Sequence, residues 1–288
     1  MLPNFLLVGA LRSGTTSLYY SLKKHPSIYF PELKEPRFFS WLAKGKGNGP
    51  RDDNIPFINS WEAYKKLYLN TGMAEAIGDA SVENLFFHNK VIPHIKHYLG
   101  DTKIIIILRN PYERAISSYR YMLMKGRETL PFKRALEQEE KRMKENWLPI
   151  WFYKNNGFYY NQVKSYLNSF SKVKILIFED LLYRPEQTLK DIHSFLLPKS
   201  NLINNTFSKS NFSGIEGFCS FYQNHLLIRK VNQWMPQKMR KYYIQTLNVV
   251  LKDKQSYNHL INKLNKCYNN DIQKLMNLIN RDLDPWLK

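Results

Sequence analysis

The segment Phe5-Leu-Leu-Val-Gly-Ala-Leu-Arg-Ser-Gly-Thr-Thr-Ser17 decides the fold of this chain. It begins with a short apolar stretch, passes through a glycine-containing turn and ends in residues that suit the start of a helix. We therefore predict a buried strand over residues 4–9 and a helix over residues 14–25. The backbone N–H groups at such a helix start point outward together and favour a bound anion. The segment thus predicts an anion-binding turn at the end of the first strand.

The turn departs from the loop of a nucleotide hydrolase. Gly9 and Gly14 have the G-x-x-x-x-G spacing of a P-loop, in which Lys and then Ser or Thr come next. Here Thr15 and Thr16 follow, so the lysine that holds a nucleoside triphosphate is missing, and Arg12 supplies a cation inside the turn instead. The turn therefore favours phosphate or sulfate without the usual magnesium triphosphate. A glycine turn that binds nothing is the simplest alternative.

A second apolar run supports the anion site. Lys103-Ile-Ile-Ile-Ile-Leu108 is typical of a strand buried on both faces of a parallel sheet. Asn110-Pro111 then predicts the start of a helix over 111–124. A nucleotide hydrolase usually places an Asp for magnesium near such a strand end, whereas this strand ends in Arg109. Because ligands bind beyond the carboxyl ends of parallel strands, we expect Arg109 beside the anion turn. A surface arginine paired with Glu113 is the alternative.

Strand and helix patterns alternate along most of the chain, which predicts an α/β fold. The expected architecture is a P-loop-like three-layer fold, with a central parallel sheet flanked by helices and a helical C-terminal region. One domain is expected over residues 1–288. Residues 40–58, rich in Gly, Pro and Asn, and residues 198–214 are expected to form long loops. The further strands are expected near 28–30, 75–79 and 174–179, and the further helices near 61–69, 84–98, 131–145, 157–170 and 186–196.

The two anion-seeking segments resemble those of sulfotransferases that use 3′-phosphoadenosine 5′-phosphosulfate (PAPS). Arg12-Ser-Gly-Thr-Thr-Ser17 is similar to the family's 5′-phosphosulfate loop. Arg109, followed eight residues later by Ser117, is similar to its 3′-phosphate motif. Lys34-Glu-Pro-Arg-Phe-Phe39 resembles the acceptor-side segment of the bacterial and heparan-type branch. Weaker similarity to later segments of this branch is found at His25-Pro26, residues 157–162, 174–180 and 282–286.

The resemblance implies a sulfotransferase with PAPS as donor, its desulfated form PAP as product and no metal. The acceptor would be a glycan or a small hydroxylated metabolite, sulfated on a hydroxyl or an amine. Residues 40–58 would then form a mobile lid over this acceptor. The implied donor-binding residues are Arg12, Ser13, Gly14, Thr15, Thr16 and Ser17 for the phosphosulfate, Arg109 and Ser117 for the 3′-phosphate, and Tyr159.

The resemblance also implies three catalytic residues. Arg12 would stabilise the charge that develops on the leaving oxygen. Lys34, and Arg37 beside it, would contact the donor sulfate or an anionic acceptor. Glu35 matches the carboxylate that faces the acceptor and is the expected general base, with Glu32 as its rival. Phe38-Phe39 is expected to exclude water from Glu35 and raise its pKa.

A structural role for the same segment is an alternative. Glu35 would then pair with Lys34 or Arg37 and order the loop. Lys34 and Arg37 would be cations on the surface of that loop. Thermal stability and the rate of transfer, measured on one Glu35 variant, separate the two roles.

Composition agrees with a folded enzyme that handles anions. The net charge of +19 raises the local concentration of anionic ligands. No nucleic-acid-binding motif and no apolar run of membrane-spanning length are found, so nucleic acid and membrane are not expected partners and a cytoplasmic location is expected. Cys219 and Cys267 have no metal-site spacing and are expected to be buried thiols. Two other functions remain open: a nucleotide kinase or NTPase with a degenerate P-loop, and a non-catalytic basic protein that binds polyanions.

Overall fold

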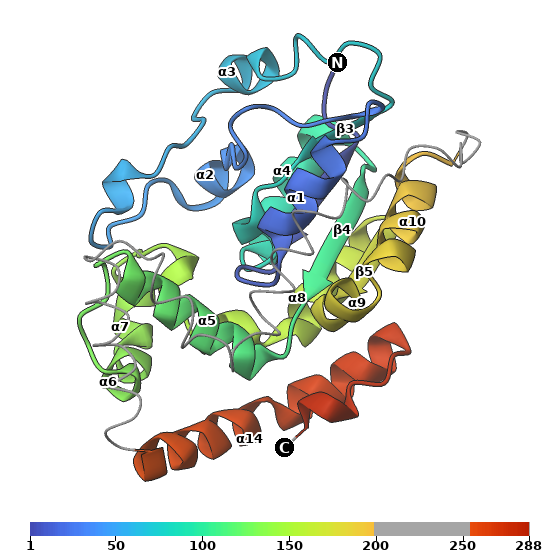
Figure 1. The fold of residues 1–288 in the computed structure, drawn as a ribbon. Helices are drawn as coiled ribbons and strands as arrows, with labels where there is room; N and C mark the ends of the chain where they lie inside the picture. Colours follow the sequence, from blue (N-terminus) through green and yellow to red (C-terminus); the bar gives the residue numbers. More distant parts are fainter. Residues whose placement is uncertain (199–253, 288) are drawn as a thin grey trace, which may run out of the picture. The chain divides into compact units, whose positions relative to one another are not determined.

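The computed structural model describes residues 1–198 and 254–287, and its framework is one parallel sheet (Figure 1). The strands lie in the order β2-β3-β1-β4-β5, and every neighbouring pair is parallel. The expected central parallel sheet is therefore confirmed. The strands are β1 (Phe5–Gly9), β2 (Ile28–Tyr29), β3 (Ala76–Asp79), β4 (Lys103–Leu108) and β5 (Val173–Ile177).

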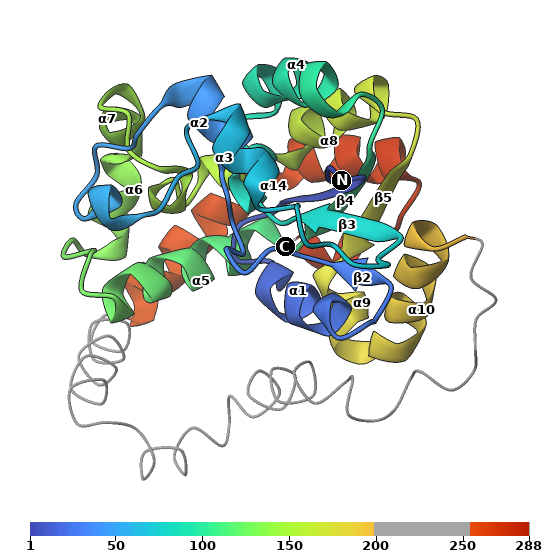
Figure 2. The same cartoon turned by 90° about the horizontal axis from the view of Figure 1, so that it is seen from above.

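Both faces of the sheet are covered by helices, which explains the unbroken apolar run of β4 (Figure 2). One face packs against α1, α9 and α10 through a core that includes Phe5, Leu18, Ile105 and Ile192. The opposite face carries α4 and α8, which are joined by a hydrogen bond between His88 and Ser165. These helices are α1 (Thr15–Lys23), α4 (His88–Leu99), α8 (Tyr159–Ser169), α9 (Phe178–Tyr183) and α10 (Pro185–Leu196).

The helix that follows β4 agrees with its sequence signals. α5 spans Pro111–Met124, as predicted, and the Asn110 side chain accepts hydrogen bonds from the N–H groups of Tyr112 and Glu113. The predicted helix over 131–145 is divided at Gln138, between α6 and α7. The bounds of the helices outside the two sheet faces are α2 (Phe38–Lys44), α3 (Trp61–Lys66), α6 (Phe132–Glu137), α7 (Glu139–Lys144) and α14 (Lys254–Ile279).

The predicted loop over 40–58 is wrong in its first part, where α2 forms. The Phe38 ring stacks on Tyr64 with centroids 4.8 Å apart, and this burial stabilises a helix that local composition does not favour. The later part contains Asp52, a fully buried carboxylate that accepts hydrogen bonds from the N–H groups of Gly49 and Leu148. An anchored carboxylate does not suit the expected mobile lid.

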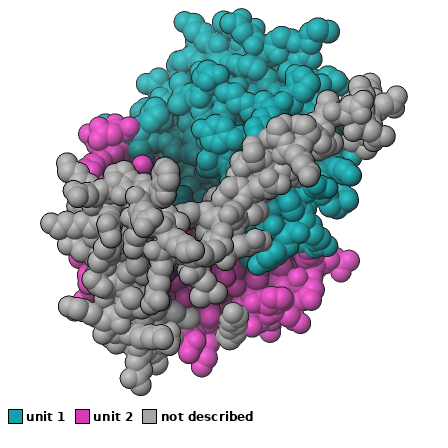
Figure 3. Space-filling model, viewed as in Figure 1, with its two compact units in different colours: residues 1–46, 55–109, 161–219 teal, residues 47–54, 110–160, 220–288 magenta. Residues whose placement is uncertain are grey.

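The chain divides into two compact units, coloured separately in Figure 3. Unit 1 contains the sheet, and unit 2 contains α5, α6, α7 and α14. A single domain over 1–288 stays a prediction. The units comprise residues 1–46, 55–109 and 161–219 (unit 1) and residues 47–54, 110–160 and 220–288 (unit 2).

Three sequence expectations concern the C-terminal region and the surface. Cys267 is exposed on α14, whose buried face carries Tyr268 and Ile272, so the expectation of a buried thiol is wrong there. Cys219 and the loop predicted over 198–214 lie outside the described residues. Within 1–198 and 254–287, the helices are too short or too polar to cross a membrane.

Candidate functional site

The turn between β1 and α1 has the geometry that its glycines predict. Gly14 precedes α1 with a φ of 85°, a left-handed conformation that glycine adopts without strain. A Cβ atom at Gly14 would also lie 2.8 Å from the Phe178 ring, so a larger residue does not fit. Arg12 also has a left-handed φ, of 66°. The turn therefore places the first N–H groups of α1 at the carboxyl end of β1, an arrangement that favours an anionic ligand.

The hydroxyl groups of the turn fit an anionic ligand. Ser13 is fully buried, and its Oγ has no hydrogen-bond partner among the described residues. A buried hydroxyl without a partner is costly, and a phosphate or sulfate oxygen would satisfy it. Thr15 is buried, Thr16 is exposed and Ser17 is half-buried. The expected donor-binding residues of the turn thus share one helix start.

Arg109 lies directly after β4 and is almost completely buried, so it is not a surface arginine. Its guanidinium group lies over the ring of Phe178, 4.8 Å from the centroid. The same ring limits the space at Gly14. Phe178 therefore brings the ends of β1, β4 and β5 together, as expected for a site beyond parallel strands. Our sequence analysis did not single out Phe178, although its position after the β5 run is a signal for it.

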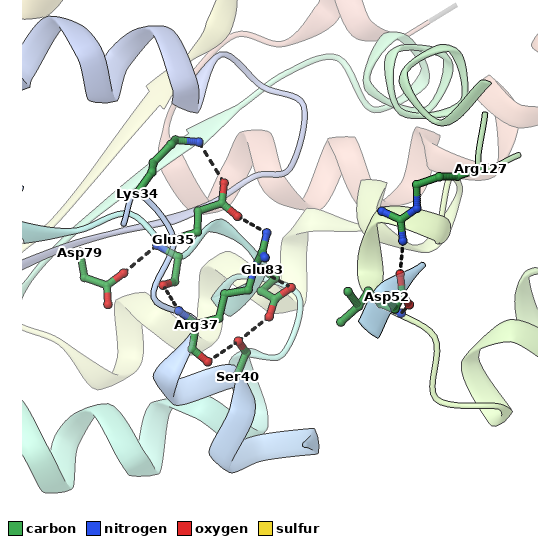
Figure 4. Close-up of polar contacts among 10 residues, drawn as sticks. Lys34, Glu35, Arg37, Ser40, Asp52, Asp79, Glu83 and Arg127 are labelled. Atoms are coloured by element: carbon green, nitrogen blue, oxygen red, sulfur yellow. Dashed lines mark hydrogen bonds and ion pairs between the residues drawn. The ribbon is translucent and has the colours of Figure 1, made fainter. Parts of the chain in front are cut away.

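The acceptor-side segment forms a chain of polar contacts in unit 1 (Figure 4). Lys34 Nζ donates hydrogen bonds to Thr16 Oγ1 at 3.0 Å and to Glu35 Oε1 at 2.9 Å. Arg37 donates to the second carboxylate oxygen of Glu35 at 2.5 Å. Lys34 therefore joins the expected base to the anion turn, and two cations face one carboxylate.

The pKa of Glu35 is lowered rather than raised. Burial alone raises the pKa, but the charges and hydrogen bonds of Arg37 and Lys34 together outweigh it. The expectation of a raised pKa is wrong for this reason. Phe38 and Phe39 both pack against Tyr64, in the aromatic core below α2. Glu35 is thus an ionised carboxylate at neutral pH.

A second carboxylate, absent from our sequence analysis, lies behind Arg37. Glu83 belongs to a short 3₁₀ helix over Val82–Asn84, and its Oε2 lies 3.6 Å from Arg37 Nε. The Ser40 hydroxyl donates a short hydrogen bond to its other oxygen. Burial raises the pKa of Glu83. No sequence pattern marks this residue, because its partners are more than 40 positions away in the chain.

The backbone at Arg37 is held by a second polar chain. Its N–H donates to Ser81 Oγ at 2.8 Å, and Ser81 N–H donates to Asp79 Oδ1 at 2.7 Å. Asp79 also accepts the Tyr64 hydroxyl at 2.7 Å, and burial raises its pKa. The acceptor-side segment is therefore fixed to the end of β3 and is not a loose surface loop.

The remaining expected residues have less direct support. Ser117 is half-buried on α5, and Tyr159 is fully buried at the first residue of α8, where Asp271 accepts its N–H at 2.7 Å. Their contacts to a nucleotide stay predictions. The rival base Glu32 has a side chain that is 97% exposed and pairs with Lys23. Such exposure favours Glu35 over Glu32. Among the residues that the structure describes, no group of three or more potential metal ligands gathers.

Comparison with known proteins finds sulfotransferases. The sulfotransferase family model matches residues 3–197. The crystal structure of a sulfotransferase from Alicyclobacillus acidocaldarius superposes with a TM-score of 0.76 and 30% identity, covering 100% of both chains. The chain is also 26% identical to mouse carbohydrate sulfotransferase 15, over 68% of this chain and 44% of that protein. It is 25% identical to human bifunctional heparan sulfate N-deacetylase/N-sulfotransferase 2, over 68% of this chain and 22% of that protein. The chain thus spans less than half the length of the curated relatives it matches.

Proposed function

This chain belongs to the sulfotransferase family, and on that premise we propose that it transfers a sulfuryl group from PAPS to a hydroxyl or amine of a glycan or small metabolite. One observation carries the proposal. Lys34 Nζ contacts both Thr16 in the anion turn and Glu35 in the acceptor-side segment. One side chain, Lys34, therefore links the anion turn, where the donor would be held, to a carboxylate that can accept a proton.

The donor-binding roles follow from the geometry of the turn and from the sequence motifs. The N–H groups and hydroxyls of residues 13–17 hold the 5′-phosphosulfate, and Arg12 stabilises the negative charge on the leaving oxygen. Arg109 and Ser117 hold the 3′-phosphate, and Tyr159 adds a nucleotide contact. The burial of Arg109 supports its role, because a buried guanidinium forms strong charge-assisted hydrogen bonds with phosphate.

The transfer step needs positioning, electrostatic stabilisation and a base. By analogy with phosphoryl transfer, the acceptor oxygen forms a bond to sulfur while the bond from sulfur to the PAP oxygen breaks. The acceptor proton passes to a carboxylate oxygen of Glu35, and PAP leaves with the electron pair of the broken bond. The hydrogen bond from Lys34 to Thr16 supports a role for Lys34 in contacting the sulfuryl oxygens. A reaction in the cytoplasm, without nucleic acid or membrane as partner, is part of the proposal.

Two measurements test the proposal. Thermal shift with PAP, ATP, GTP and heparin identifies the ligand class: stabilisation by PAP well beyond the others is expected, whereas stabilisation by ATP or by heparin alone would contradict it. Labelled PAPS with a panel of glycans and small hydroxylated compounds then tests transfer. Label should move from PAPS to an acceptor in the wild type, and failure with every acceptor of the panel would count against catalysis.

A further inference from the structure

Arg37 lies between two carboxylates that come from different parts of the chain (Figure 4). Glu35, two residues earlier, accepts a hydrogen bond from one guanidinium nitrogen at 2.5 Å. Glu83 lies on the opposite side, 3.6 Å from Arg37 Nε. The Glu83 side chain is only 4% exposed, whereas that of Glu35 is 18% exposed. Glu35 can therefore meet an acceptor, and Glu83 cannot.

The burial of the Glu83 carboxylate requires a physical explanation. Removing a charge from water costs several kcal/mol unless partners compensate. Glu83 has such partners, since Arg37 faces one of its oxygens and the Ser40 hydroxyl donates to the other. The backbone conformation at Arg37 does not require Glu83, because the N–H of Arg37 already donates to Ser81 Oγ. The partners of Glu83 thus point to a role in controlling the Arg37 side chain.

We propose that Glu83 is a positioning residue for the general base: it holds the Arg37 guanidinium against Glu35 and offsets its positive charge. The inference rests on the proposed function of Glu35. With Glu83 present, two cations, Lys34 and Arg37, are balanced by two carboxylates. Without it, both cations act on Glu35 alone, which then holds a proton less readily and becomes a weaker base.

The other charged groups around the pair do not change this direction. Lys44 also faces Glu83 and favours its ionised form, which keeps the compensating charge in place. Asp79 interacts with Glu35 from the end of β3, where it is bonded to Tyr64. Replacing Glu83 by an isosteric amide removes the charge that Lys44 faces and leaves the bond between Asp79 and Tyr64 in place. Lys44 is then one more cation without a compensating carboxylate, so the direction of the effect on Glu35 stays the same.

A carboxyl titration followed by NMR tests the inference without an acceptor. Glutamate ¹³Cδ signals are recorded against pH, and the Glu35 signal is assigned by its loss in Glu35→Gln. Burial raises the pKa of Glu83, and two cations lower that of Glu35, so Glu83 protonates first as the pH falls. In the wild type, the Glu35 signal should therefore show a first phase at the pH where Glu83 protonates, and this phase should be absent in Glu83→Gln. The control Glu128→Gln also neutralises a buried glutamate, which pairs with Arg142 at 2.7 Å, and should keep the first phase of the Glu35 signal.

The results separate this inference from the proposed function. A Glu35 signal with no first phase in the wild type, or with the same first phase in folded Glu83→Gln, would overturn it, and so would loss of the phase in Glu128→Gln. If Glu83→Gln does not fold, Ser40→Ala replaces it, since loss of the Ser40 donor weakens the ionised form of Glu83. The first phase should then move to higher pH, and an unmoved phase overturns the inference. For an acceptor found by screening, Glu83→Gln should lower kcat by about tenfold, part of the hundredfold or more that a general base contributes. A wild type without transfer activity would reject the proposed function and leave the NMR result to decide the role of Glu83.

Discussion

Glu35, the base in the proposed function, has a side chain that is ionised and only partly exposed. Its charge is held by Arg37 and Lys34, and burial of the pair keeps these contacts close. Two cations lower its pKa, so Glu35 is a weaker base than an isolated glutamate but remains ionised at all neutral pH values.

Glu35→Gln tests the base directly. The amide keeps the shape of the side chain and cannot accept a proton, so transfer should fall by about a hundredfold or more, with PAP affinity retained. Because the folded pKa is lowered, the acid limb of kcat/KM in the wild type should lie below the ordinary range of glutamate. The control is Glu32→Gln, on the exposed glutamate three residues earlier. A variant that loses thermal stability but keeps its single-turnover rate would assign Glu35 a structural role instead.

Arg109→Ala tests the 3′-phosphate contact. A hydrogen bond to a charged group contributes about 1.5–3 kcal/mol, and 1.4 kcal/mol corresponds to tenfold in affinity, so PAP should bind about tenfold more weakly or worse. Calorimetry measures the affinity. Arg184→Ala, on an arginine with a 64% exposed side chain, is the matched control and should leave it unchanged. Equal PAP affinity in folded Arg109→Ala would exclude this assignment.

At the scale of the elements, the start of α1 depends on the fit between Gly14 and Phe178. Gly14→Ala imposes a left-handed conformation on alanine and brings its Cβ to 2.8 Å from the Phe178 ring. Gly72→Ala imposes the first cost alone, because Gly72 has a φ of 56° with nothing within 4 Å of an added Cβ. We expect a loss of about 1 kcal/mol for Gly72→Ala in urea unfolding. Gly14→Ala should lose more free energy of unfolding than Gly72→Ala, and it should also weaken PAP binding. Equal losses in the two variants would show that the Phe178 ring moves to make room for the added Cβ.

The buried carboxylate of Asp52 collects several of the hydrogen bonds that hold the segment around it. Besides two backbone N–H groups, Asp52 accepts from Trp151 Nε1 at 3.2 Å and from the Arg127 guanidinium. Asp52→Ala leaves Arg127 without this partner, so the free energy of unfolding should fall by about 3–5 kcal/mol. Asp53→Ala, at the exposed neighbour, should change it by about 0.5 kcal/mol or less. A small effect of Asp52→Ala in urea unfolding would mean that the segment is held by other contacts.

At the scale of the whole molecule, a buried histidine beside a half-buried one makes stability depend on pH. His193 on α10 lies with its ring centroid 4.8 Å from that of His25, which follows α1. Burial and the neighbouring His25 lower the pKa of His193 from 6.5 to about 4. The folded state therefore binds fewer protons than the unfolded state between pH 6.5 and 4.

Stability should accordingly fall as the pH decreases through this window and stop depending on His193 below it. At about 1.4 kcal/mol per pKa unit, the loss from this group is about 3 kcal/mol in total. His193→Phe keeps a ring and removes the titration, so its urea midpoint should fall less between pH 7 and pH 4.5. His97→Phe, on an exposed histidine of α4, should behave like the wild type. An identical pH dependence in His193→Phe would rule out this residue as the cause.

The parts of the fold that the sequence predicted are those stabilised by local signals. The β1–α1 turn follows from two glycines, β4 from an unbroken apolar run, and α5 from the Asn110 cap. The helices that it missed, α2 and α9, are six or seven residues long and have weak local signals. Such short helices form because distant residues bury them, as Tyr64 does for Phe38 at the start of α2.

The candidate site also has some features that follow from local sequence signals and others that depend on distant residues. The sequence alone predicted the turn after β1 and an arginine directly after β4 from local backbone preferences, and the carboxylate of the acceptor-side segment from the resemblance of residues 34–39. The burial of Arg109 came only from the structure, because the sequence left a surface arginine open. Only the tertiary structure decided that Phe178 lies between Gly14 and Arg109, that Glu83 faces Arg37, and that the pKa of Glu35 is lowered. These features depend on distances between side chains that are far apart in the chain, and electrostatic interactions and packing act over distance in space, whatever the separation in sequence.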